Sequence, residues 1–167
     1  MKQNYFQLFN LEPRFQIEEA ALQQAWREAA SKVHPDRFAT ALAAERRVAI
    51  QWSGIINQAY DTLKKPLARA IYLLELAGHD VQAENNTCMD PSFLMTQMQL
   101  REQLDEATGD TPKLQAMQAE ILQTEHDLAN TMQVLLDEQQ DYDSATQKAR
   151  EWMFIDKIHQ EINAKLP

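Results

Sequence analysis

The sequence predicts an all-α protein, and three observations support that prediction. Only three glycines and six prolines occur among 167 residues, which argues against a fold rich in tight turns. Apolar residues recur every three or four positions over several long stretches, as in helices that bury one face. Residues 83–87 are polar and aperiodic, and they separate these stretches into two groups. We therefore expect two packed helical units joined by a linker at residues 77–90.

The first unit is expected over residues 1–76. An apolar cluster at residues 5–11 predicts a short docking helix that packs across longer ones. A long helix is expected over residues 17–33 and another after Thr40, and their apolar stripes should pair antiparallel. A shorter helix should follow over residues 66–76. The second long helix should bury the stripe Val48, Trp52, Ile55, Ile56, Ala59 and Leu63.

The second unit is expected to be a three-helix bundle over residues 91–167. Asp90 followed by a proline is an N-cap and first-turn pair, which predicts a helix over residues 91–107. Thr111 and Pro112 repeat the same signature for the next helix. The bundle core should comprise Leu114, Met117, Ile121, Leu128, Met132 and Leu135 on the second helix, and Ala145, Ala149, Trp152, Ile155, Ile158 and Ile162 on the third.

The charges are distributed unevenly between the two units. Residues before Gly78 carry 10 basic and 8 acidic side chains, whereas the remainder carries 6 basic and 17 acidic ones. Nucleic acid is not an expected partner, because phosphate contacts need a basic surface. No stretch approaches the roughly 20 apolar residues that span a membrane, and the first residues form no signal core. We expect a cytoplasmic protein without membrane contact.

Cysteine and histidine usage argues against metal sites and cofactors. Cys88 is the only cysteine, so neither an intrachain disulfide nor a zinc cluster can form. His79, His126 and His159 are scattered without the spacing of metal ligands. We expect no bound metal and no cofactor.

A corner interrupts the first long helical pattern at His34, Pro35 and Asp36. Pro35 disfavours helical geometry for His34 and cannot donate an intrahelical bond, so the polar residues should project from a loop. A histidine near an aspartate could indicate catalysis, but no motif supplies a serine or cysteine nucleophile, and no glycine-rich phosphate loop occurs. We therefore expect a contact site and not an enzyme.

The helix over residues 91–107 has two apolar faces when residues advance about 100° each. Phe93, Leu100 and Leu104 suit the bundle core. The opposite side carries Leu94, Met95 and Met98, continued by Glu102 and Glu106. Methionine adapts to irregular partner surfaces, which favours binding. The alternative is that this second face is buried against the first unit or consists of scattered surface residues. Phe154 is expected to be an exposed aromatic beside this surface, as in a binding hot spot.

Two sequence segments resemble a J-domain. Residues 26–38 contain His34-Pro35-Asp36, and residues 56–66 read Ile-Asn-Gln-Ala-Tyr-Asp-Thr-Leu-Lys-Lys-Pro. That resemblance covers residues 5–76. Residues 67–74 and 93–102 are similar to the HscB family of iron-sulfur cluster co-chaperones, a resemblance that spans nearly the whole chain.

The family resemblance implies a non-enzymatic adaptor with two partners. The His34-Pro35-Asp36 loop would stimulate ATP hydrolysis by HscA, a DnaK-type chaperone, and the bundle would deliver the iron-sulfur scaffold protein IscU to it. The resemblance places chaperone binding on His34, Pro35, Asp36, Arg27, Lys32 and Arg37. It places scaffold binding on Leu94, Met95, Met98, Gln99, Glu102, Glu106 and Phe154.

This sequence departs from the family pattern at Thr96 and Gln99, where bacterial relatives carry glutamate, so part of the acidic rim is missing. Eukaryotic members add a targeting segment and a cysteine-rich metal site, which this chain lacks, so we expect a bacterial-type protein. A general J-domain protein that binds unfolded clients, or an oligomeric interaction module, is the alternative. We expect a monomer.

Overall fold

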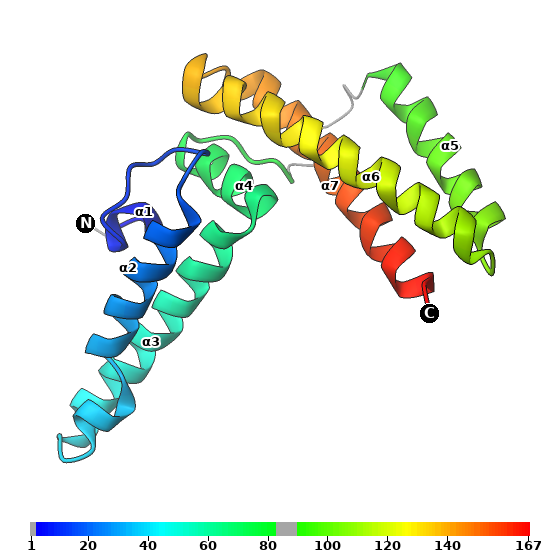
Figure 1. Cartoon of the computed structure of the whole chain (residues 1–167). Helices are drawn as coiled ribbons and strands as arrows, with labels where there is room; N and C mark the ends of the chain where they lie inside the picture. The colour runs from blue at the N-terminus through cyan, green and yellow to red at the C-terminus, as the bar shows by residue number, and fades with distance from the viewer. Residues whose placement is uncertain (1–2, 83–89) are drawn as a thin grey trace. The chain divides into compact units, whose positions relative to one another are not determined.

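The computed structural model describes residues 3–82 and 90–167, and within these ranges it contains helices and no strands (Figure 1). The all-α prediction is confirmed. The chain divides into two compact units, Met1–Leu73 and Leu74–Pro167. The division falls inside helix α4 (Pro66–Leu76). Residues 83–89 of the predicted linker, including Cys88, lie outside the described residues, and the domain boundaries stay a prediction.

The first unit is built around α2 and α3, which lie side by side as an antiparallel hairpin (Figure 1). Asn4 and Gln7 form a reciprocal capping box, which stabilises the four-residue helix α1. The Tyr5 N–H donates to the Tyr72 hydroxyl at 2.9 Å, and the two rings stack, joining α1 to α4. The core contains Phe6, Phe9, Phe15, Leu22, Ile56, Ala59 and Leu63. The elements are α1 (Tyr5–Leu8), α2 (Glu19–Lys32), the short 3-10 helix η1 (Pro35–Phe38), α3 (Ala43–Lys64) and the first part of α4.

The predicted apolar stripe of α3 is wrong at its first half. Ile56, Ala59 and Leu63 are buried as expected, but Val48, Trp52 and Ile55 are exposed. The buried residues of α3 are instead residues 49, 56, 59 and 63. They form a line along one side of the helix that begins at Ala49, one residue after the predicted start at Val48. Val48 and Ile55 lie at the edge of that line, whereas Trp52 falls within it by helical spacing and is nevertheless exposed.

Trp26 of α2 connects the two helices of the hairpin. Its indole Nε1–H donates to Oδ1 of Asn57 at 3.0 Å, and its ring meets Tyr60 edge to face with centroids 4.6 Å apart. These contacts fix how α2 and α3 are paired, and hence where the loop between them projects.

The second unit begins at the end of α4, which closes with a left-handed residue. Gly78 has φ of +88°, and the N–H groups of Gly78 and His79 bond the carbonyls of Glu75 and Leu74. This Schellman motif needs a residue that adopts a positive φ without strain, and glycine does so because it has no Cβ. The chain then packs on α7 (Tyr142–Lys165), where Val81 is buried.

Each helix of the bundle begins with an aspartate cap. The carboxylates of Asp90, Asp110 and Asp141 accept hydrogen bonds from backbone N–H groups of the first turns. The cap of α6 is therefore Asp110 and not Thr111, which is the first residue of that helix. Helix α5 (Pro91–Ala107) has the predicted limits. It is followed by α6 (Thr111–Gln133) and the π-helical turn η2 (Val134–Glu138).

The bundle core predicted on α6 and α7 is confirmed with one correction, and Leu100 of α5, also predicted for the core, is only half-buried. All six residues predicted on α7 are buried, as are those predicted on α6 up to Met132. Leu135 is only half-buried, and Leu136 is buried in its place. The π-helical turn adds a residue to the helical cycle at this point, which shifts the inward position by one.

Candidate functional site

The predicted chaperone-binding loop forms the turn between α2 and α3. His34 has extended backbone geometry, φ −61° and ψ 137°, as expected before a proline. Pro35 opens η1, and Nδ1 of His34 accepts a hydrogen bond from the N–H of Asp36 at 3.2 Å. All three residues are exposed, and the Asp36 side chain is 93% exposed.

That hydrogen bond depends on the tautomer of the His34 imidazole. Nδ1 can accept from a backbone N–H only while it carries a lone pair, so this contact requires the tautomer with its proton on Nε2. The Asp36 carboxylate lies 3.6 Å from Nδ1, a separation that would become an ion pair only if the ring were protonated. The loop thus offers one donor and one carboxylate to a partner.

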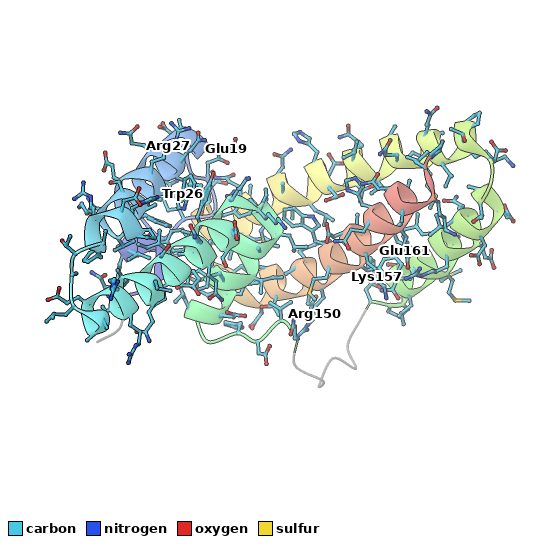
Figure 2. All side chains as sticks on the ribbon, turned by 90° about the horizontal axis from the view of Figure 1, so that it is seen from below. Glu19, Trp26, Arg27, Arg150, Lys157 and Glu161 are labelled. Atoms are coloured by element: carbon cyan, nitrogen blue, oxygen red, sulfur yellow. The ribbon has the colours of Figure 1, made fainter. Side chains whose placement is uncertain are left out.

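The predicted basic residues do not form one cluster with the loop. Arg27 follows Trp26 on α2 (Figure 2), and Arg27, Lys32 and Arg37 are all exposed. Five positions on a helix of 3.6 residues per turn place Arg27 and Lys32 about 140° apart around α2. Lys32 and Arg37 flank the loop, whereas Arg27 lies on another side of the helix.

Helix α5 shows the two predicted faces. Phe93, Leu104 and Ala107 are buried on one side. Leu94, Met95 and Met98 are 46%, 63% and 67% exposed. The remaining predicted polar members of the surface, Gln99, Glu102 and Glu106, are exposed as well. We call Leu94, Met95 and Met98 the apolar strip of α5.

Phe154 is not the freely exposed aromatic that the sequence predicts. It is half-buried on α7, where its ring meets Phe93 edge to face with centroids 5.9 Å apart. The guanidinium of Arg101 lies over the Phe154 ring at 5.5 Å, and Arg101 also forms an ion pair with Glu161. Sequence reasoning missed Arg101 and Glu161, because 60 residues separate this pair and no local pattern connects them.

The end of α5 is acidic. Glu102, Asp105 and Glu106 are exposed toward its C-terminus, and its last turn holds no basic residue to balance the negative end of the helix dipole. Beside them a groove of about 240 Å³ runs between α5 and α6. It is lined by Gln103, Glu106, Ala107, Lys113, Ala116, Met117 and Glu120.

The described residues offer no candidate metal cluster and no candidate membrane-spanning helix. No three histidine, aspartate or glutamate side chains within residues 3–82 and 90–167 come together in a group that could hold a metal ion. Over the same part of the chain, no helix is both long enough and apolar enough to cross a bilayer.

Comparison with known proteins assigns the family. The family model described as the HscB C-terminal oligomerisation domain matches residues 89–163. A co-chaperone protein HscB homolog of Bordetella petrii is 52% identical, over 98% of this chain and 96% of its own. The chain belongs to the HscB co-chaperone family. An HscB homolog of Burkholderia mallei is 43% identical over 99% of this chain and 95% of its own.

Solved HscB structures share the whole fold. The chaperone HscB from Vibrio cholerae matches with a TM-score of 0.83 at 36% identity, covering 97% of this chain and 96% of its own. Human co-chaperone HscB matches with a TM-score of 0.92 at 26% identity, over 98% and 82%. The first unit is accordingly a J-domain and the second the C-terminal helical domain of an HscB protein. Its relatives are named co-chaperones, and this chain is a co-chaperone and not an enzyme.

Proposed function

We propose that this HscB protein binds the iron-sulfur scaffold protein IscU through its second unit and delivers it to the chaperone HscA. In the proposal, the His34-Pro35-Asp36 loop then stimulates ATP hydrolysis by HscA in the cytoplasm. The observation that carries the proposal is the apolar strip of α5, which is exposed although the opposite face of the same helix already fills the bundle core.

The strip has the chemistry of a protein-binding surface. Three adjacent large apolar side chains on one helix face are an unfavourable arrangement in water unless a partner covers them. Two of them are methionines, which adapt to an irregular surface. The carboxylates of Glu102 and Glu106 continue the same side of the helix and would select a partner with basic residues nearby.

The acidic end of α5 supports the same proposal. Carboxylates near a helix C-terminus oppose the helix dipole, each by typically 0.3–1 kcal/mol when exposed. Asp105 and Glu106 lie in the last turn of α5 and therefore weaken that helix. A binding role gives these residues a function that offsets the lost stability.

The loop supports the chaperone half of the proposal. His34 and Asp36 are exposed on a rigid turn between two long helices, which is a common place for residues that contact a partner. Lys32 and Arg37 flank the loop with positive charge suited to an acidic surface on the ATPase. One chain that holds both partners raises the effective concentration of the scaffold at the chaperone, without any signal passing between the units.

A second candidate function is an oligomeric interaction module, because the matching family model is described as an oligomerisation domain. In that case the strip would be covered by another copy of the chain. Light scattering after size-exclusion chromatography distinguishes the two: a monomer with an accessible strip favours scaffold binding, and a dimer that Met98→Glu dissociates favours the module.

The proposal is tested with purified partners. We expect wild-type protein to bind IscU in calorimetry and to raise ATP turnover by HscA. The His34→Gln variant should bind IscU with unchanged affinity and give no stimulation. Stimulation that persists in this variant would exclude the loop from the mechanism, and failure of the wild type to bind IscU would exclude the scaffold role.

A further inference from the structure

Phe154 is surrounded by three residues that sequence reasoning did not assign to binding. Phe93 meets the edge of its ring, the guanidinium of Arg101 covers the ring at 5.5 Å, and Glu161 forms an ion pair with Arg101. We call Phe93, Arg101 and Glu161 the Phe154 clamp. It joins α5 to α7 at the border of the apolar strip.

The position of the clamp follows from the geometry of α5. At about 100° per residue, Leu94 and Arg101 are seven positions apart and lie nearly in line along the helix. Phe93 lies on the buried side of that line, and Met98 on the exposed side. A ring that contacts both Phe93 and Arg101 is therefore at the boundary where the core ends and the strip begins.

The contacts leave the Phe154 ring little freedom. An edge-to-face aromatic pair fixes the tilt of one ring against the other, and a guanidinium over a ring face favours one rotamer. Arg101 is itself held, because its guanidinium forms an ion pair with the Glu161 carboxylate on α7. The Arg101 and Glu161 side chains are 40% and 35% exposed, so this arrangement faces water on one side and the core on the other.

We propose that Arg101 is a positioning residue for scaffold binding: held by Glu161, it fixes the Phe154 ring in the orientation in which the ring joins the apolar strip. The inference rests on the proposed binding of IscU by this surface. A ring that is already ordered loses little side-chain freedom when a partner covers it, so part of the entropic cost of association is avoided.

Two other roles for Arg101 make different predictions. A direct ion pair with a scaffold carboxylate would contribute whether or not Phe154 is present. A staple between α5 and α7 would also act independently of that ring, by keeping the bundle intact. A positioning role disappears once Phe154 is removed, and a double-mutant cycle measures this difference.

The experiment uses the full chain and purified IscU, with affinities measured by calorimetry at a temperature where every variant is folded. Phe154→Ala should weaken binding about thirtyfold, as expected for a hot-spot residue. Arg101→Gln should weaken it about threefold to tenfold. The double variant should be no weaker than Phe154→Ala alone. Arg101→Lys keeps a cation over the ring and should retain most of the affinity.

Two further variants separate positioning from charge. Glu161→Gln changes no residue of α5 but releases Arg101, so it should weaken binding in the same direction by a smaller factor. Lys157 lies four residues earlier on α7 and is exposed (Figure 2), so Lys157→Gln removes one positive charge outside the clamp and should leave affinity unchanged.

The ring itself supplies a readout that does not depend on binding. In the free protein, the aromatic NMR signals of Phe154 should shift in Arg101→Gln and stay close to wild type in Arg101→Lys. Any of three results would overturn the positioning role. They are additive losses of affinity in the double variant, unchanged affinity in Arg101→Gln, and a loss in Lys157→Gln equal to that in Arg101→Gln. Unchanged affinity in Phe154→Ala would instead exclude Phe154 from the proposed scaffold-binding surface.

Discussion

Nδ1 of His34 accepts the backbone N–H of Asp36 at 3.2 Å, so the imidazole shapes the loop while the Asp36 carboxylate remains free of the backbone. The two side chains therefore have separable tasks. His34 orders the turn through Nδ1, and Asp36 presents a charge. This division gives a test in which the fold and the contact respond differently.

We expect Asp36→Asn to remove stimulation of HscA without affecting folding. The carboxylate is almost fully exposed, so the free energy of unfolding should change by less than about 0.5 kcal/mol. Stimulation of ATP turnover should fall at least about tenfold, because a charged contact is lost. Asp61→Asn makes the same change at an exposed position of α3 and serves as the control. Equal stimulation by both variants would contradict the assignment.

The two tryptophans of the hairpin should differ in their effect on stability. Trp26 is half-buried and bonded to Asn57, so we expect Trp26→Ala to lower the free energy of unfolding by about 2 kcal/mol, less than for a fully buried tryptophan. Trp52 is 43% exposed, and Trp52→Ala should cost about 1 kcal/mol or less. Urea unfolding followed by circular dichroism measures both values. A larger loss for Trp52→Ala would restore the stripe that the sequence predicts.

Binding and stability should separate along the apolar strip. Met95 and Met98 are exposed, so replacing each by alanine should leave the free energy of unfolding within about 0.5 kcal/mol of wild type. Affinity for IscU should nevertheless fall, by up to thirtyfold where the residue is a hot spot. Leu122→Ala, at an exposed apolar position of α6, is the matched control and should bind normally. If all three variants bind equally, the strip is not the scaffold surface.

A structural feature of this chain could be predicted from the sequence where it depends on residues close together in the sequence. Helix α5 begins at Pro91 and ends at Ala107 as predicted, because an aspartate-proline pair and a nearby glycine act within a few residues. The strip was predictable for the same reason, since one helix defines both of its faces.

Features that depend on contacts between helices were not predictable. Val48, Trp52 and Ile55 match a helical stripe as well as the buried residues do, and only the packing of α2 on α3 decides between them. The half-burial of Phe154 depends on Phe93, far away in the sequence. Local periodicity contains no information on either point.

Arg150 should stabilise the segment that follows α4. Its guanidinium donates to the carbonyls of Val81 at 3.0 Å and Asp80 at 3.4 Å, fixing residues 79–82 on α7. We expect Arg150→Gln to lower the free energy of unfolding by about 1 kcal/mol. This is less than is usual for a charged donor, because Arg150 is partly exposed. Amide hydrogen exchange of residues 79–82 should accelerate, while exchange in α6 should stay unchanged. Unchanged protection of this segment would show that buried Val81 and the packing of His79 on Tyr142 hold it without Arg150.

The aspartate cap of α7 makes stability depend on pH. Hydrogen bonds from the hydroxyl and N–H of Ser144 hold the pKa of Asp141 below its usual value, and those from Ser92 lower the pKa of Asp90 in the same way. A carboxylate with a depressed folded pKa contributes stability that is fully present above its unfolded pKa of about 3.9. The contribution is lost as the pH falls through the folded pKa.

Asp141→Asn tests this dependence, because asparagine also caps helices but carries no charge. We expect wild type to have the higher melting temperature at pH 7, since a charged cap bonds more strongly and suits the positive end of the helix. The difference should narrow as the pH falls below about 4 and passes through the lowered pKa of Asp141. Asp141→Ala lacks any acceptor and should remain less stable than wild type over the whole range. A gap between wild type and Asp141→Asn that is constant with pH would show that the charge of this cap does not contribute to stability.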